Sequence, residues 1–219
     1  MIASYEGIYE VTETAGYLLA ANKSDEAYRV NSRKLIRWIR HGLALPSLAE
    51  VPGRQLLITF EDVISMRVIA ALRAAGLSFN KIYIAEAWLR AHTGKQRPFA
   101  TEVLWTERSE VLIDFQAQLI AASRHGQLAM DILRNYIIPV HGLTFNDDQV
   151  ASSWEPSTGI LLHPEIQFGA PCIKDTRIPT KTLWGMVEAG DSVKWLAKAY
   201  RVSEGEVDTA IDWERRLAA

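Results

Sequence analysis

A basic stretch near the amino terminus carries the clearest chemistry in this sequence. Between residues 30 and 43 there are four cationic side chains and no carboxylate: Arg33, Lys34, Arg37 and Arg40. Helical spacing places Leu35, Ile36 and Ile39 on one side of a helix and leaves the cations on the other. Lysine and arginine on such a helix can neutralise phosphates, and arginine also binds guanine in the major groove. The spacing is therefore suited to contact with DNA.

The same stretch contains a helix start. Asn31 or Ser32 can cap it, and both side chains can also contact the DNA backbone. An ordinary amphipathic helix with a solvated basic face would show the same residues. The context favours DNA binding, because a small capped helix precedes the stretch, and residues 45–60 can turn and return as the strand LLITF in the manner of a wing. We predict that Asn31, Ser32 and the four cations contact DNA.

Residues that commonly carry catalysis lack the partners that they would need. The five histidines show no metal-ligand spacing, and no cysteine lies near any of them. Cys172 lies in an apolar Pro-Cys-Ile context, which favours a buried thiol over a nucleophile. Asp147 and Asp148 follow Asn146 in a stretch typical of a turn. We therefore expect a protein that is not an enzyme and has no metal or cofactor.

An acidic helix near the carboxyl terminus suggests a second surface. Residues 203–216 contain five carboxylates, which a phosphate backbone would repel. Such a helix either covers the core as a solvated element or forms an interface with a protein partner or a second copy of the chain. In Asp-Thr-Arg-Ile-Pro, the guanidinium of Arg177 is expected chiefly to bond oxygens of its own turn, and insertion into a partner is the alternative. The candidate interface residues are Arg177, Trp184, Glu204, Glu206, Asp208 and Asp212.

The bulk properties are those of a globular protein. Of 219 residues, 48% are hydrophobic and 23% charged, and no apolar run approaches the roughly twenty residues of a membrane helix. No secretory signal is visible, and a single cysteine fits a reducing cytoplasm. The net charge of −2 combines a basic front and an acidic back. Residues 1–98 carry 13 basic and 9 acidic side chains, whereas residues 99–219 carry 11 and 17.

Periodicity predicts the elements that hold these surfaces. A first helix over residues 8–20 should be capped by Thr12 or Thr14, with Leu18 and Leu19 inward. Two further helices should follow LLITF and break at residues 76–78. Strands are expected within residues 99–119, a helix over residues 126–137, and a hairpin around residues 146–148. The four tryptophans placed in amphipathic helices are expected to pack in a core or interface: Trp38, Trp88, Trp184 and Trp195.

The carboxyl-terminal quarter should be compact. Short strands at residues 160–162 and 172–173 precede three helices. Gly190 ends the first helix, Asp191 or Ser192 caps the second, and Ser203 with Glu206 forms a capping box for the third. The last two helices form a helix-turn-helix outline. The buried side of the last helix should consist of Val207, Ala210 and Ile211, with Trp213 as a further candidate.

This quarter resembles a small domain of unknown function that is found in many prokaryotic antitoxins of the VapB type, which are encoded beside PIN-like toxins. The family pattern Gly-x-Pro-x-Ile-x-Gly-Thr-Arg-Ile-Pro is matched by Gly169, Pro171, Ile173, Thr176, Arg177, Ile178 and Pro179. Asp175 stands where the pattern has glycine. If that position has a positive φ, aspartate is among the few residues that tolerate it.

Residues 9–92 resemble the winged-helix domain of MerR-type regulators in the order of helix-turn-helix, wing and the segment LRAAGLSFNKI. MerR proteins carry Leu-Arg-Tyr-Tyr in the second helix. This chain has Leu35-Ile36-Arg37-Trp38, which moves the arginine by one position. The resemblance implies a DNA-binding front domain, and the shift leaves open which base edges Arg37 would reach.

We expect a mainly α protein with small β elements, an α+β fold. Its parts should be a winged helix over residues 1–98, an α+β connector over residues 99–158, and a helix-turn-helix domain over residues 159–219. The resemblances imply a cytoplasmic, homodimeric antitoxin of a type II system that binds a PIN-like ribonuclease toxin and operator DNA. The alternative is a stand-alone MerR-like regulator whose rear domains sense a small molecule.

Overall fold

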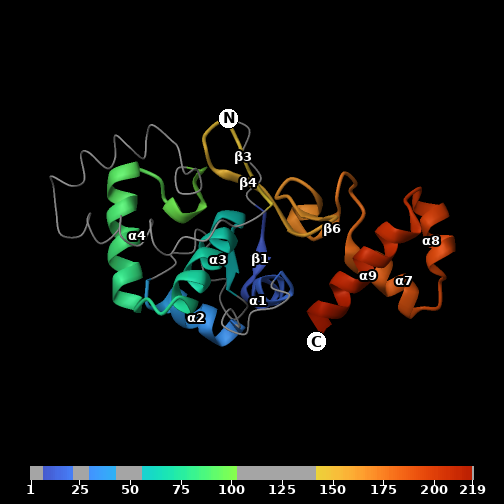
Figure 1. The fold of residues 1–219 in the computed structure, drawn as a ribbon, viewed down its shortest axis with the longest axis horizontal. Helices are drawn as coiled ribbons and strands as arrows, with labels where there is room; N and C mark the ends of the chain where they lie inside the picture. Colours follow the sequence, from blue (N-terminus) through green and yellow to red (C-terminus); the bar gives the residue numbers. More distant parts are fainter. Residues whose placement is uncertain (1–6, 22–29, 43–55, 103–141, 219) are drawn as a thin grey trace.

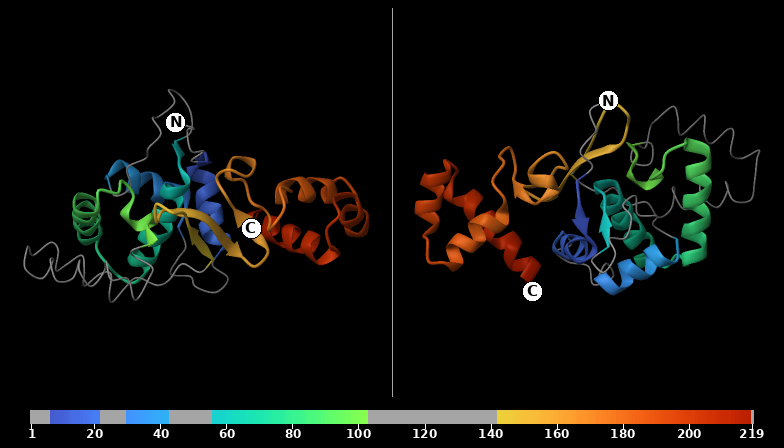
Figure 2. Two further views of the ribbon diagram at one scale, coloured as in Figure 1. Left: turned by 90° about the horizontal axis from the view of Figure 1, so that it is seen from above. Right: turned by 180° about the vertical axis from the view of Figure 1, so that it is seen from behind.

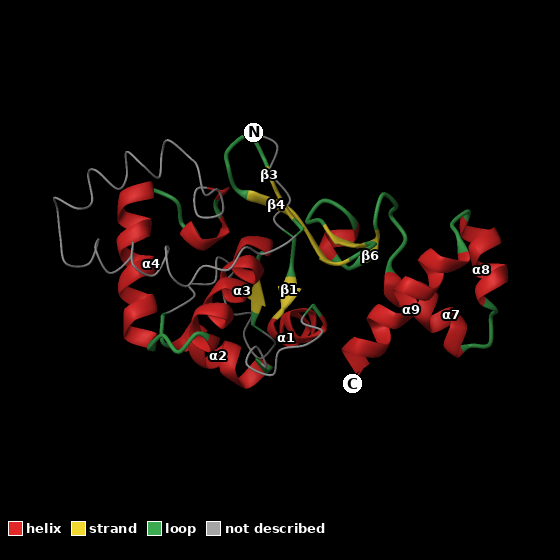
Figure 3. Cartoon of the chain, in the orientation of Figure 1, coloured by secondary structure: helices red, strands yellow, loops and turns green. Residues whose placement is uncertain are grey.

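The computed structural model describes residues 7–21, 30–42, 56–102 and 142–218. Within these residues the chain forms seven α-helices and two small antiparallel sheets (Figure 3), which confirms the α+β fold. The strands and the helix expected between residues 103 and 141 lie outside the described residues, as does most of the expected wing.

The front of the molecule is a group of four helices with a two-stranded sheet. The helices are α1 (Val11–Ala20), α2 (Ser32–Arg40), α3 (Phe60–Ala74) and α4 (Phe79–Thr93). Strand β1 (Tyr9–Glu10) pairs antiparallel with β2 (Leu57–Ile58). LLITF therefore contributes a strand, as expected, although only two of its residues belong to it. The break between α3 and α4 falls at residues 75–78, and a short 3-10 turn, η2 (Pro98–Ala100), closes this unit.

The start and orientation of α1 differ from the prediction. Its N-cap is Glu10, which forms a capping box with Glu13. Thr14, one of the two expected caps, lies inside the helix, where its buried hydroxyl donates to the Glu10 carbonyl over 3.0 Å. Leu18 is buried as predicted, but Leu19 is 40% exposed, so its predicted inward position is wrong. The buried side of α1 instead includes Tyr17.

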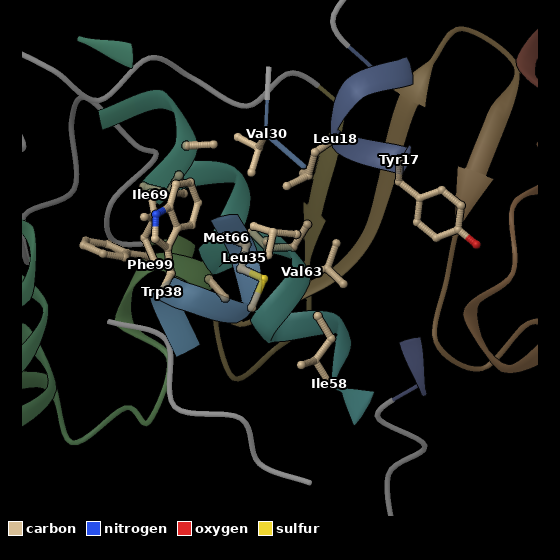
Figure 4. Close-up of a cluster of buried hydrophobic side chains, with 14 of the residues drawn as sticks. Tyr17, Leu18, Val30, Leu35, Trp38, Ile58, Val63, Met66, Ile69 and Phe99 are labelled. Atoms are coloured by element: carbon tan, nitrogen blue, oxygen red, sulfur yellow. The ribbon is translucent and has the colours of Figure 1, made fainter. Parts of the chain in front are cut away.

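The main core joins all four front helices (Figure 4). The apolar spacing predicts Val63, Met66, Ile69, Ala70 and Leu72 on the inner side of α3, and Phe79, Ile82, Ala85, Trp88 and Leu89 on that of α4. All of them are buried except Phe79, which is half-buried. Their burial confirms the predicted inner sides of these two helices. Asp62, at the start of α3, is also buried, and its carboxylate accepts from the Thr59 backbone and from the Arg97 guanidinium. The front core therefore encloses an ion pair whose partners are far apart in the sequence.

A four-stranded antiparallel sheet connects the front to the rear. Its order is β3 (Leu143–Phe145), β4 (Ala151–Ser157), β5 (Ile160–Leu162) and β6 (Cys172–Ile173). The predicted hairpin is confirmed, because residues 146–150 turn between β3 and β4. The expected domain boundary at residue 158 falls between two neighbouring strands of this sheet, and Trp154 and Leu162, which pair across those strands, both join the main core.

Three helices form the rear, at one end of the molecule in Figures 1 and 2. They are α7 (Thr180–Glu188), α8 (Val193–Tyr200) and α9 (Glu204–Ala218). Gly190 has a φ of 105° after α7, and the Ser192 hydroxyl accepts from the Trp195 amide. Ser203 and Glu206 form the predicted capping box, since each side chain accepts from the other residue's backbone amide. The predicted helix ends are therefore confirmed.

Helix α9 belongs to both cores. Its first half buries Val207, Ala210 and Ile211 in a small rear core with Leu183 and Leu196. Its second half carries Trp213 into the main core, where the side chain is 0% exposed. The Trp213 ring stacks on Tyr17 of α1. One helix thus joins the rear helices to the front.

Candidate functional site

Helix α2 presents a basic surface. Its buried side chains are Leu35, Trp38 and Ile39, whereas all four cations are exposed: Arg33, Lys34, Arg37 and Arg40. No carboxylate in the described ranges forms an ion pair with Arg33, Arg37 or Arg40. The structure therefore places the four predicted cations together on the solvent side of one helix, and the charges of Arg33, Arg37 and Arg40 face an external anion. We call this set the α2 basic face.

The two polar residues at the start of α2 occupy different positions. The Asn31 side chain accepts from the Lys34 amide over 3.0 Å, so it caps the helix as predicted. Ser32 is half-buried at the first helical position. Both lie at the N-terminal end of the basic face, where backbone N–H groups add to its positive potential.

Neighbouring helices hold α2 firmly. Leu35 is fully buried in the main core, and α2 also packs against α1. At the other end, the Trp38 ring meets the edge of Phe79, with centroids 6.0 Å apart, and the Arg73 guanidinium lies 4.6 Å from the Phe79 ring. Phe79 belongs to α4 and is itself held by Arg73 of α3, so α1 and α4 fix the position of the basic face.

The turn before α7 is organised by Thr176. Its hydroxyl donates to the Ile173 carbonyl over 2.8 Å and accepts from the Ile178 amide over 3.1 Å. Asp175 adopts a φ of 61°, as expected if glycine is the family residue there. The Arg177 side chain is exposed, and its guanidinium has no hydrogen bond to a described residue, whereas its carbonyl accepts from Gln167. Among the described residues, the Thr176 hydroxyl rather than the Arg177 guanidinium thus holds this turn, and the role of the guanidinium stays a prediction.

The remaining predicted interface residues lie on α7 and α9. Glu204, Asp208 and Asp212 are exposed, whereas the Glu206 carboxylate is engaged by the amide and hydroxyl of Ser203. These hydrogen bonds lower the pKa of Glu206. Trp184 is half-buried beneath Arg215, whose guanidinium also donates to Asp212 over 3.2 Å. The acidic surface of α9 is thus present, but Glu206 is largely committed to its own helix.

Sequence reasoning missed one exposed group. Trp195 was expected in a core or interface, yet it is 54% exposed. Leu196 and Ala197 occupy the buried side of α8, and Trp195 is rotated from them by about 100° and about 200° around the helix. The cations Lys194, Lys198 and Arg201 are exposed beside it. The exposure of Trp195 could have been predicted from the sequence, because its helical position lies outside the apolar side of α8.

The Cys172 thiol is buried at the start of β6. Burial raises the pKa of the Cys172 thiol to about 11, which disfavours the reactive thiolate. The part of the chain that the structure describes contains no group of three or more His, Cys, Asp or Glu side chains able to hold a metal. None of the described helices combines the length and apolar character needed to span a bilayer.

The chain was compared with known proteins. Residues 160–213 match a family described as a protein of unknown function (DUF433). A Mycobacterium tuberculosis protein named "Putative antitoxin VapB45" is 24% identical over 188 residues, covering 77% of this chain and 76% of that protein. The crystal structure of Rv2018, also from Mycobacterium tuberculosis, superposes with a TM-score of 0.67 at 23% identity. That match covers 93% of this chain and 96% of Rv2018, so the two share a fold over nearly their whole length.

Proposed function

We propose that this chain is the antitoxin of a type II toxin–antitoxin pair. It binds and silences a PIN-like ribonuclease toxin in the cytoplasm, and as a homodimer it represses its own operon by binding DNA. It acts by binding rather than by catalysis. The match of residues 160–213 to the family of unknown function supports this proposal, since that segment resembles domains of VapB-type antitoxins. The name of the Mycobacterium tuberculosis relative supports it as well.

The observation that carries the DNA-binding part is the α2 basic face. Four cations project from a single capped helix whose opposite side is buried. Arg33 and Arg37 are four residues apart, so they lie one above the other and can contact phosphates or guanine along one groove. In the MerR-like arrangement, α2 is the recognition helix. Two copies double the contact with a two-fold operator.

The toxin-binding part rests on the rear unit. Its candidate surface comprises the exposed residues Arg177, Glu204, Asp208 and Asp212, together with the half-buried Trp184 and Glu206. This surface lies on the segment that matches the antitoxin-associated family, and Figure 1 shows it at the end of the molecule away from α4. Toxin and DNA would therefore occupy separate surfaces.

Charge reversal on α2 tests the DNA-binding part. DNA fragments bound by the full-length chain are selected from its own genome, and affinity for the selected site is then measured. Arg37→Glu should weaken binding at least tenfold, because it removes one phosphate or base contact and adds repulsion. Adding Arg33→Glu should abolish binding. Lys181→Glu, which makes the same change at an exposed residue of α7, should leave affinity unchanged. Equal affinities for all these proteins would reject α2 as the recognition helix.

A further inference from the structure

Helix α8 carries an exposed basic stripe that the proposed function does not use. Lys194, Lys198 and Arg201 are separated by four and three residues, which aligns them along one side of the helix. All three are exposed, and none forms an ion pair with a carboxylate of the described residues. Three like charges are thus gathered without local compensation. We call them the α8 basic stripe.

Two further features indicate that this stripe meets another molecule. Trp195, beside the stripe, exposes 54% of its surface, and exposed tryptophan is enriched among the residues that anchor protein interfaces. Arg201 ends α8 with a φ of 58°, a conformation that glycine adopts more cheaply. Arg201 thus places a bulky cation at a position where its backbone conformation is unfavourable. Both observations are expected of an interface.

A complementary surface lies on α9. Glu204, Asp208 and Asp212 follow one another at four-residue intervals, and all three are exposed. We call them the α9 acidic stripe. At 1.5 Å per residue, the α8 stripe is about 10 Å long and the α9 stripe about 12 Å long. The two stripes therefore carry opposite charges over similar lengths, with three cations on α8 and three carboxylates on α9, of which Asp212 also pairs with Arg215 of its own helix.

We infer that two copies of the chain associate through their rear units, with α8 of each copy packed against α9 of the other. A two-fold axis makes each contact occur twice, which gives six opposite-charge pairs and buries both Trp195 rings. This inference rests on the homodimer of the proposed function and names the surface that forms it. It assigns the α9 acidic stripe to self-association, so that Arg177, Trp184 and Glu206 remain of the candidate surface for the toxin. Nucleic acid is a poorer occupant of α8, because the acidic stripe of the adjoining helix repels phosphates.

This arrangement leaves the DNA-binding surface free. Figures 1 and 2 show α8 at one end of the long axis, whereas α2 and α4 lie toward the other end. A dimer formed by the rear units therefore carries its two α2 basic faces at its outer parts. One association can then present two recognition helices to one operator.

A charge-swap experiment tests the surface. Sedimentation of full-length protein at about 50 mM salt, where charge attraction is weakly screened, should show a dimer that weakens in high salt. K194E/K198E and D208K/D212K should each weaken dimerisation at least tenfold, because each places like charges opposite one another. An equimolar mixture of the two variants should regain the dimer, since both interfaces of the mixed pair again join opposite charges. Circular dichroism checks that each variant is folded.

Other results overturn the inference in distinguishable ways. If both variants remain dimers, the chain dimerises elsewhere and the homodimer of the proposed function stands. If each variant is monomeric and the mixture is also monomeric, the two stripes do not face each other. A wild-type protein that is monomeric throughout overturns both this inference and the proposed homodimer. If K194E/K198E dimerises normally but loses affinity for an RNA homopolymer, the stripe binds nucleic acid.

Discussion

The aromatic rings of Tyr17 and Trp213 stack at the junction of front and rear, with centroids 6.3 Å apart and planes inclined by 27°. Trp213 belongs to α9, the helix that covers the rear core, and Tyr17 belongs to α1, which packs against α2. Leu217 of α9 also lies against Gly16, and Arg216 donates to Ser157 over 3.1 Å. The rear unit is thus anchored to the helix that supports the basic face.

Trp213→Ala should therefore destabilise the whole protein. Removing a fully buried indole leaves a cavity that costs about 3–5 kcal/mol, and it also removes the main contact between α9 and α1. Denaturant unfolding should show a lower midpoint and separate front and rear transitions. Trp195→Ala is the matched control. That ring is largely exposed in the single chain, so in high salt, where the proposed dimer dissociates, the substitution should change stability by less than about 0.5 kcal/mol. Equal effects of the two substitutions would contradict the described packing.

Gly169→Ala should reveal the close approach of the connection between β5 and β6, which contains Gly169, to Tyr9 of β1. Gly169 has a φ of 93°, and a Cβ there would overlap the Tyr9 hydroxyl and ring. We expect a loss of more than about 2 kcal/mol from overlap and backbone strain together. Gly190→Ala is the control, since its φ is 105° but nothing lies within 4 Å of the added atom. That variant should lose only the stability that the backbone strain costs. Similar losses for both would show that Gly169 is not crowded.

Asp175→Gly should stabilise the rear unit. The Asp175 backbone has a φ of 61°, which costs an L-residue free energy that glycine does not pay, although glycine also gains entropy in the unfolded chain. We expect a net gain of about 0.5 kcal/mol, read from the thermal midpoint. Asp175→Ala should lose stability at the same position, because alanine tolerates this conformation less well. A stabilising alanine would contradict the assigned conformation.

The salt dependence of DNA affinity should distinguish the α2 basic face from the α8 basic stripe. If Arg33, Lys34, Arg37 and Arg40 each neutralise a phosphate, the logarithm of DNA affinity should fall steeply with the logarithm of salt concentration. Removing one contact by Arg40→Ala should reduce that slope by about one. Lys198→Ala should leave the slope unchanged once both proteins are compared as dimers. An unchanged slope for Arg40→Ala would remove that residue from the DNA surface.

Glu214 should make stability depend on pH. Burial raises the pKa of this carboxyl above its ordinary value of 4.5, against the opposing hydrogen bond from Thr180. The folded state therefore binds the proton more tightly than the unfolded chain, and stability from this group falls as pH rises through that range. Glu214→Gln should stabilise the protein at pH 7 by about 0.5–1 kcal/mol and have little effect at pH 4. No difference between the two pH values would contradict this assignment.

Local signals in the sequence predicted much of the fold. Asn31, Ser192 and the pair of Ser203 and Glu206 are capping residues whose partners lie within three positions, so the sequence contains the whole interaction. The periodic apolar residues of α3 predicted its buried side for the same reason. The α2 basic face could be predicted because all of its residues lie in one short helical stretch.

Long-range packing decided the positions that were predicted wrongly. Leu19 is exposed because α1 turns Tyr17 toward Trp213, which is almost two hundred residues away in the sequence. The buried pair of Arg97 and Asp62 likewise has no local signature. Within the described residues, the turn before α7 is bonded through the Thr176 hydroxyl, whose two partners the sequence does not identify. Each of these outcomes depends on which elements meet, and periodicity does not give that information.

Neutralisation of a toxin is the most direct test of the proposed function. The tagged full-length chain is purified from its native host, co-purifying proteins are separated from it under denaturing conditions and refolded, and their ribonuclease activity is measured with and without added chain. We predict a small stoichiometric partner that cleaves RNA alone and loses that activity when the chain is restored in equimolar amount. Recovery of the chain alone, or RNA cleavage that the chain does not reduce, would contradict the antitoxin proposal.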